Sequence, residues 1–171
     1  MYIFFFDLDN TLFPTDSSKF LHNLTSARLP TVGHMEALYN RNIGYDHKLR
    51  KLLHKIKYPK FIITNASRLH CLLILKNLGI MEYFGGGIDA DHLRRQNLKP
   101  NPHPFMLAKN AFKIEKHNKC IFFDDVSVNL IIPKRMGWIT VLISKKRNKL
   151  PYIDFWFPNI YKALSYFNNK I

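Results

Sequence analysis

Two acidic residues stand one position apart directly after an apolar run near the start of the chain. Residues 2–6 carry only aromatic and aliphatic side chains, and Asp7 and Asp9 follow them. Such a run predicts a strand that is buried on both faces. Ligands in open α/β sheets bind beyond the carboxyl ends of the strands. We therefore expect the two carboxylates to lie in a ligand pocket that attracts a cation.

Two later apolar runs also end in groups that suit such a pocket. Residues 59–63 lead into Thr64, and residues 120–123 lead into Asp124 and Asp125. Both runs predict short strands, each of which delivers a hydroxyl or carboxylates at its carboxyl end. The same arrangement of strand and polar group thus occurs three times along the chain.

Lys99 adds a cation between the second and third runs, in the proline-rich stretch 99–104. An acid pair, a hydroxyl, a lysine and a second acid pair together suit phosphoryl transfer. Some phosphate oxygens are neutralised by a metal ion, others are held by the lysine and the hydroxyl, and a carboxylate attacks phosphorus. A single acid pair would be a weak signal, so the prediction depends on all four groups.

The elements that must position these groups alternate between strands and helices. The apolar patterns and turn residues predict strands at residues 2–6, 59–64, 88–90, 119–124, 138–143 and 154–157, and helices at 46–57, 66–78, 104–114, up to 135, and 159–168. This alternation predicts an α/β fold with a central parallel sheet between two layers of helices. We expect one domain over residues 1–171, with a flap and small cap insert at about 14–44.

In this order the four groups resemble the motifs of the haloacid dehalogenase (HAD) superfamily of phosphohydrolases. Residues 7–11 resemble the first motif, Thr64 the second and Lys99 the third, and the pair Asp124-Asp125 resembles the fourth. The resemblance extends over residues 3 to about 143. It implies the three-layer, Rossmann-like core of that superfamily.

Further residues resemble the pyrimidine 5′-nucleotidase-like branch of the superfamily. The shared residues are Asn10, Leu12 and Phe13 after the first acids, Asn65, Ala66 and His70 around the second motif, Phe105 after Lys99-Pro100, and Asn129 after the last acids. The chain departs from the branch at Val126, where serine is usual. It departs more in the stretch between the first two motifs, where the branch carries a longer helical cap.

The resemblance implies a role for each catalytic residue. Asp7 would be the nucleophile that forms an aspartyl-phosphate. Asp9 would first be the general acid for the leaving oxygen and then the general base for water. Thr64 and Lys99 would hold the phosphoryl oxygens and compensate their charge.

The resemblance also implies a metal site and substrate contacts. The metal, expected to be Mg²⁺, would bind Asp7, the main-chain carbonyl of Asp9 and a carboxylate of the last pair. Asp125 aligns with the usual direct ligand, whereas Asp124 would either bind the metal or support the site from behind. The implied phosphate or substrate contacts are Leu8, Asn65 and His70. For the histidine, a capping or packing role is an equal alternative.

The chain is strongly basic. It has 26 Lys and Arg against 12 Asp and Glu, which gives a net charge of +14 over 171 residues. Such a charge would steer anionic substrates toward the pocket and could hold nucleic acid nonspecifically. Codon bias in an AT-rich genome explains the abundant lysine equally well.

Prolines and glycines in residues 14–44 predict only short helical pieces in the insert. An insert this small leaves the site open. Candidate substrate contacts in and just after this stretch are Arg28, His34, Tyr39, Asn40, Arg41 and Tyr45. The two tyrosines are equally suited to anchoring a short cap helix.

The expected function is a Mg²⁺-dependent phosphomonoesterase that acts on a phosphorylated small molecule, with a nucleotide as the expected substrate. An open site also suits macromolecular phosphates, namely nucleic-acid ends or phosphoproteins, and an oligomer that borrows its cap from a second copy is a further alternative. A non-catalytic phosphate-binding module is disfavoured because every motif residue is present. A dehalogenase is disfavoured by Asp9, since dehalogenases of this superfamily lack the second acid, and a phosphomutase would need a larger cap.

The two cysteines, Cys71 and Cys120, fall on predicted buried faces and are expected to be reduced core residues. The apolar start lacks the basic region of a signal peptide, and no run reaches the roughly 18 apolar residues of a membrane helix. We therefore expect a cytoplasmic protein with no membrane partner.

Overall fold

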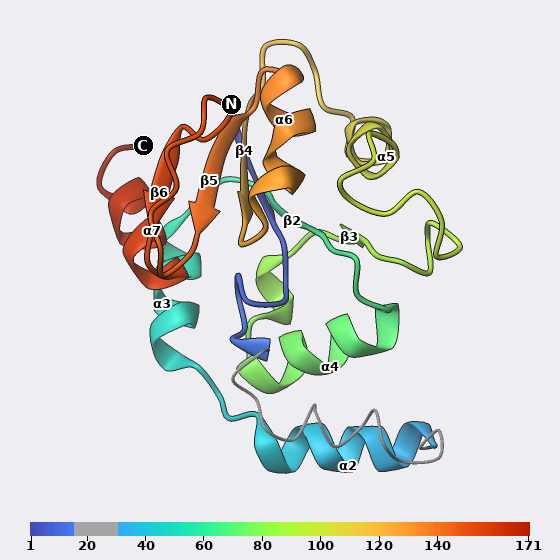
Figure 1. The fold of residues 1–171 in the computed structure, drawn as a ribbon. Coiled ribbons are helices and arrows are strands. Elements are labelled where there is room, and N and C mark those ends of the chain that lie inside the picture. The colour runs from blue at the N-terminus through green and yellow to red at the C-terminus, as the bar shows by residue number, and fades with distance from the viewer. Residues whose placement is uncertain (16–30) are drawn as a thin grey trace.

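The fold was analysed in a computed structural model that describes residues 1–15 and 31–171. Its centre is a six-stranded parallel sheet in the order β3-β2-β1-β4-β5-β6 (Figure 1). The strands are β1 (Tyr2–Phe6), β2 (Lys60–Ile63), β3 (Gly87–Ile88), β4 (Lys119–Asp124), β5 (Ile139–Ile143) and β6 (Phe155–Phe157). The predicted α/β fold with a central parallel sheet is confirmed.

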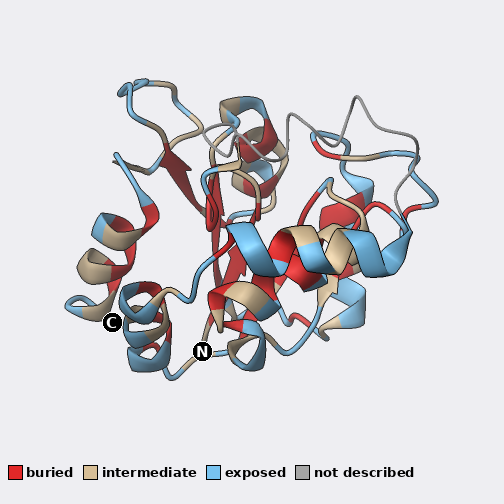
Figure 2. Cartoon of the chain, turned by 90° about the horizontal axis from the view of Figure 1, so that it is seen from below, coloured by how far each residue is buried: buried red, intermediate tan, exposed pale blue. Residues whose placement is uncertain are grey.

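Helices cover both faces of this sheet, which makes three layers. The first face carries α3 (His47–Lys55), α4 (Arg68–Leu78) and α7 (Ile160–Asn168), and the second carries α5 (His103–Ala111) and α6 (Ile131–Arg135). Short 3₁₀ helices in the described part of the chain are η2 (Met81–Tyr83) and η3 (Ser127–Leu130). The strands are largely buried, whereas the outer sides of the helices are exposed (Figure 2).

Strand β1 packs through aromatic rings on both of its faces. Phe5 stacks on Trp138 with ring centroids 4.7 Å apart, and Phe6 stacks on Phe123 at the same separation on the opposite face. Full burial of a side chain of this size contributes about 1.5–3 kcal/mol. These contacts hold the end of β1 firmly, and Asp7 and Asp9 follow directly from it.

The register of the sheet brings the acids of two strands level with each other. Phe6 of β1 pairs with Phe123 of β4, and the next residues are Asp7 and Asp124. The Asp7 main-chain N–H donates a hydrogen bond to the Phe123 carbonyl at 2.9 Å. Because Phe6 also pairs with Ile62, strand β2 ends at the same edge of the sheet.

Helices α3 and α4 begin at residues whose side chains cap a helix N-terminus, and α4 ends at a glycine. The Asp46 carboxylate accepts from Leu49 N at 2.8 Å and caps α3, and the Ser67 hydroxyl accepts from His70 N at 3.3 Å and caps α4. Gly79 ends α4 with a left-handed φ of 69°. Ser67 and Gly79 are the helix start and stop that the sequence predicts. The bounds of α3, α4, α5 and α7 differ from the predicted ranges by only a few residues at each end.

The insert contains a longer helix than predicted. Helix α2 (Val32–Asn42) has 11 residues and is capped by the Thr31 hydroxyl. Gly33 in its first turn does not interrupt it, and Tyr39 on its inner side is buried. The expectation of only short helical pieces is therefore wrong for this part, because packing of one side against α4 supports a regular helix. Arg28 lies outside the described residues.

Within the described ranges, no helix has both the length and the apolar character needed to cross a bilayer.

Candidate active site

The carboxyl ends of the central strands surround a cavity of about 260 Å³. The predicted site residues that line it are Asp7, Asp9, Thr64, Asn65, Lys99 and Asp125. All four sequence motifs therefore contribute a side chain to one cavity. We call it the active-site cavity.

Asp7 lies at the bottom of this cavity in contact with Lys99. The Lys99 ammonium donates to Asp7 Oδ1 and to Asp124 Oδ2, both at 2.7 Å, and its side chain is 1% exposed. Burial raises the pKa of Asp7 to about 7, against the lowering effect of Lys99. Burial alone would lower the pKa of Lys99, but the two carboxylates outweigh it and raise that pKa. The lysine therefore stays charged between two acids.

Asn65 fixes the position of Lys99. Its Oδ1 accepts from Lys99 N and its Nδ2 donates to Lys99 O, both at 2.9 Å. The amide thus clamps the main chain that carries the ammonium. The motif resemblance implies a phosphate or substrate contact for Asn65. Its side chain does line the cavity, and the structure adds this positioning role.

Thr64 and Leu8 complete the wall made by the first two strands. Thr64 is buried, its N–H donates to Ile88 O at 2.9 Å, and its hydroxyl accepts from Ala66 N at 3.1 Å. The hydroxyl is therefore held at the cavity wall. The Leu8 side chain is fully buried in the core, so only its main chain is available for the predicted phosphate contact.

The last acid pair divides into a buried and a cavity-lining member. The Asp124 carboxylate accepts from Val126 N at 2.8 Å, from Asn129 Nδ2 at 3.0 and 3.2 Å, and from Lys99. Asp125 is half-buried and lines the cavity. Val126 stands where the nucleotidase-like branch usually has serine. Its bond to Asp124 comes from the main-chain N–H, so it does not depend on the side chain.

Three carboxylates offer a place for a divalent cation. One oxygen from each of Asp7, Asp124 and Asp125 lies within 4.8 Å of the others, and this is the acidic group suited to a metal among residues 1–15 and 31–171. Oxygen-only donors suit a hard ion such as Mg²⁺. The donor chemistry therefore fits the expected cofactor.

Asp9 lies at the mouth of the cavity and is bonded to His70. His70 Nε2 lies 2.8 Å from Asp9 Oδ1, and the Thr15 hydroxyl donates to the same oxygen. Burial alone would raise the pKa of Asp9, but the hydrogen bond and charge of His70, and then the bond from Thr15, hold it below its usual value. His70 thus contacts the second acid instead of lining the cavity. Neither Thr15 nor this contact is indicated by the sequence pattern, although the short Asp9–Phe13 bridge brings Thr15 back toward Asp9.

The described candidates in the insert do not line the active-site cavity. His34, Asn40 and Arg41 are exposed on α2. Tyr39 is buried, and its hydroxyl lies 2.5 Å from His70 Nδ1. Tyr45 is exposed and packs on His47 with ring centroids 4.6 Å apart.

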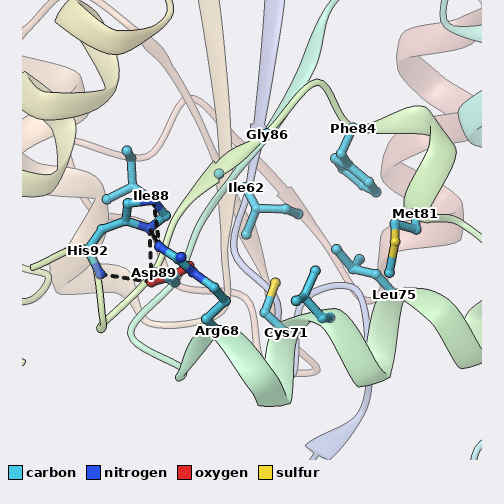
Figure 3. Close-up of a pocket in the computed structure, with 12 residues that line it drawn as sticks. Ile62, Arg68, Cys71, Leu75, Met81, Phe84, Gly86, Ile88, Asp89 and His92 are labelled. Carbon is cyan, nitrogen blue, oxygen red and sulfur yellow. Dashed lines mark hydrogen bonds and ion pairs between the residues drawn. The ribbon is translucent and has the colours of Figure 1, made fainter.

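A second cavity, of about 210 Å³, lies between α4 and the edge of the sheet at β3 (Figure 3). Its lining is mostly apolar, and its charged end is closed by contacts within the protein. Asp89 accepts from Arg68 Nε at 3.2 Å and lies 2.9 Å from His92 Nδ1. Cys71 also faces this cavity, and burial raises the pKa of its thiol to about 12. No motif residue lines this cavity.

Solved structures of low sequence identity share the whole fold. CbbY from Rhodobacter sphaeroides, solved in complex with phosphate, has a TM-score of 0.72 at 14% identity, with 94% of this chain and 95% of that chain covered. A protein assigned as beta-phosphoglucomutase from Thermotoga maritima has a TM-score of 0.74 at 14% identity, with both chains covered completely. L-2-haloacid dehalogenase from Xanthobacter autotrophicus has a TM-score of 0.67 at 12% identity, with 99% of each chain covered.

A family model identifies the sequence more specifically than these folds do. The model of the haloacid dehalogenase-like hydrolases matches residues 44–137, which is more than half of the chain. The match includes Thr64, Lys99 and the pair Asp124-Asp125, all of which the structure places at the same edge of the sheet. The chain therefore belongs to the haloacid dehalogenase-like hydrolase family.

Proposed function

We propose that this protein is a Mg²⁺-dependent phosphomonoesterase that works through an aspartyl-phosphate on Asp7. The observation that carries the proposal is the presence of two carboxylates with different surroundings in one cavity. Asp7 contacts the Lys99 ammonium at the bottom, and Asp9 is bonded to His70 at the mouth. Two such acids suit a nucleophile and an acid/base catalyst.

Each side chain then has a defined part in two displacement steps. An Asp7 carboxylate oxygen attacks phosphorus and the bond to the leaving oxygen breaks, while Asp9 gives that oxygen a proton. Asp9 next takes a proton from water, whose oxygen attacks the aspartyl-phosphate and releases inorganic phosphate with Asp7 restored. Lys99 and Thr64 hold the phosphoryl oxygens and compensate their charge. The bound phosphate also brings negative charge next to Asp9, which favours the acid form that the first step needs.

The cofactor proposal rests on the oxygen donors at the bottom of the cavity. Asp7, Asp125 and the main-chain carbonyl of Asp9 would hold Mg²⁺, and Asp124 would support the site through its bonds to Asn129 and Lys99. When bound, the ion supplies positive charge that stabilises the phosphoryl group in the transition state.

The second acid favours phosphate esters over haloacids. A halide is a weakly basic leaving group that departs without a proton, whereas the alkoxide of a phosphate ester needs one. Asp9 lines the cavity and is held by two donors, as a proton-transfer group must be. A haloacid dehalogenase would have no use for such a group.

For the substrate, we propose a nucleotide, in line with the motif resemblance to the nucleotidase-like branch. The cavity formed by the described residues, about 260 Å³, is slightly below the roughly 300–1,000 Å³ of typical ligand pockets. Such a cavity suits a phosphoryl group whose remainder lies outside it. The same observation, together with the net charge of +14, favours a macromolecular phosphate as the second candidate.

Phosphate release with Mg²⁺ or with EDTA tests these proposals. The panel holds nucleoside monophosphates, sugar phosphates, phosphopeptides and oligonucleotides phosphorylated at either end, with Asp7→Asn as the inactive control. Selective turnover of mononucleotides supports the first substrate, and turnover of only oligonucleotides or phosphopeptides supports the second. The phosphomonoesterase proposal fails if no substrate gives Mg²⁺-dependent release that Asp7→Asn abolishes.

A further inference from the structure

The two carboxylate oxygens of Asp9 have different surroundings. Oδ1 lies 2.8 Å from His70 Nε2 and also accepts from the Thr15 hydroxyl. Oδ2 has no hydrogen bond to any residue in the part of the chain that the structure describes. Two donors on one oxygen fix the rotation of the carboxylate. Oδ2 is therefore the oxygen left to exchange a proton with a substrate in the active-site cavity.

His70 is held on its other side by Tyr39. The tyrosine hydroxyl lies 2.5 Å from His70 Nδ1, and the two rings stand at 85° to each other. An ionised carboxylate only accepts hydrogen bonds, so His70 Nε2 must donate to Asp9. In the neutral imidazole, Nδ1 is then the acceptor for the Tyr39 hydroxyl. Burial, with a further contribution from Asp9, raises the pKa of Tyr39 to about 12, so the phenol remains a donor.

These three residues come from three separate parts of the chain. Asp9 follows β1, His70 lies in the first turn of α4, and Tyr39 lies on α2 in the insert. The Tyr39 side chain is 1% exposed, so water has little access to replace its hydroxyl. Contacts between α2 and α4 keep the tyrosine and the histidine together.

We propose that Tyr39 is a positioning residue that acts on the acid/base Asp9 through His70. Its hydroxyl fixes the tautomer and the ring orientation of the imidazole, and the imidazole fixes Asp9 Oδ1. The inference rests on the proposed function, because Asp9 needs this orientation only if it transfers protons to the leaving oxygen and from water. It makes helix α2 part of the proton-transfer arrangement in addition to a cover over the core.

Tyr39→Phe tests this role because it keeps the buried ring and removes only the hydroxyl. The measurement compares kcat/KM for an aryl phosphate, whose leaving group needs no proton, with kcat/KM for a primary alkyl phosphate, whose alkoxide does. We expect the value for the alkyl ester to fall about three- to tenfold, as for one lost buried hydrogen bond. The value for the aryl ester should stay within about twofold, because a step without proton transfer does not depend on Asp9.

Tyr161→Phe is the matched control. The Tyr161 hydroxyl donates to Asp46 Oδ2 at 2.5 Å, and burial raises its pKa to about 12 as well. The substitution also removes one part-buried tyrosine hydroxyl, but this hydroxyl bonds a carboxylate, Asp46, that does not line the active-site cavity. Neither ester should respond to it. In ¹⁵N spectra, the His70 ring of the wild type and of Tyr161→Phe should show a protonated Nε2 and an acceptor Nδ1, whereas Tyr39→Phe should shift Nδ1.

The outcomes separate this inference from the proposed function. An equal fall for both esters, an alkyl value that does not fall, or an unchanged Nδ1 signal in Tyr39→Phe would overturn the positioning role while the phosphatase proposal stands. A wild-type protein that hydrolyses neither ester would overturn the proposed function, and the inference with it.

Discussion

Replacing Lys99 by methionine should destabilise the metal-free protein strongly. The substitution leaves Asp7 and Asp124 buried without the ammonium that lies 2.7 Å from each. At an effective dielectric constant of 20, each contact corresponds to an attraction of about 6 kcal/mol. Desolvation offsets much of this, and breaking a buried pair typically costs about 3–5 kcal/mol. We expect the free energy of unfolding to fall by an amount in this range. Asp7, whose pKa is already about 7, can take up a proton in the variant, and this limits the loss.

Lys60→Met provides a control with the same change of side chain. Lys60 is also buried, but among residues 1–15 and 31–171 its ammonium donates only to the main-chain carbonyls of Ile56 at 2.6 Å and Tyr58 at 2.9 Å. Its replacement costs two hydrogen bonds from the ammonium to neutral carbonyls, but it also removes a charge that burial disfavours, so we expect a smaller loss of about 1–3 kcal/mol. It leaves no unpaired charge behind.

Urea unfolding at pH 7, followed by circular dichroism in EDTA and in Mg²⁺, measures both effects. The divalent cation restores positive charge beside the two acids, so it should stabilise Lys99→Met more than the wild type. At a concentration 100 times its dissociation constant, it contributes about 2.7 kcal/mol. Lys60→Met should respond to Mg²⁺ as the wild type does. Equal losses in the two variants, or a Lys99→Met protein that Mg²⁺ does not stabilise, would refute the assignment of Lys99 as the counter-charge of the acid cluster.

Three further predictions concern the metal site, the loss of folding stability at acidic pH and the reactivity of the thiols. Asn129→Ala removes the amide that orients the buried carboxylate of the last acid pair, and should weaken Mg²⁺ binding about 10- to 100-fold in titration calorimetry. Burial alone would raise the pKa of Asp154, but its hydrogen bonds, from Lys134 and from Thr140, lower it. The ionised Asp154 therefore contributes about 1–2 kcal/mol to the free energy of unfolding above its unfolded pKa, and this contribution is lost as the pH falls through its folded pKa. The difference in the free energy of unfolding between wild type and Asp154→Asn should shrink from pH 7 to pH 3 in urea titrations. Cys71 and Cys120 are buried with thiol pKa values raised to about 12, so an aromatic disulfide reagent should label neither in the native protein and both in urea.

The strands and the position of the site could be predicted because both depend on local patterns. An unbroken apolar run indicates a strand buried on both faces, and the first residue after the run must lie at its carboxyl edge. Asp7 and Asp124 follow such runs, and the register places them side by side. Helix starts and stops were equally local, as Ser67 and Gly79 show.

The contacts that tune the site could not be predicted, because they join residues far apart in the sequence. His70 is 61 positions from Asp9 and 31 from Tyr39, and the contact with Tyr39 depends on how α2 packs over α4. The clamp of Asn65 on Lys99 spans 34 positions and depends on the path of the intervening loop. Neither composition nor the spacing of motifs indicates these contacts, because they depend on how the helices and loops pack in three dimensions.

Identification of the phosphorylated residue tests the central claim most directly. The protein is quenched in acid during turnover of an aryl phosphate with Mg²⁺, and its peptides are analysed by mass spectrometry. The account predicts a phosphoryl group on Asp7, with none on the corresponding peptide of Asp7→Asn. A phosphoryl group on another residue, or full turnover by Asp7→Asn, would contradict it.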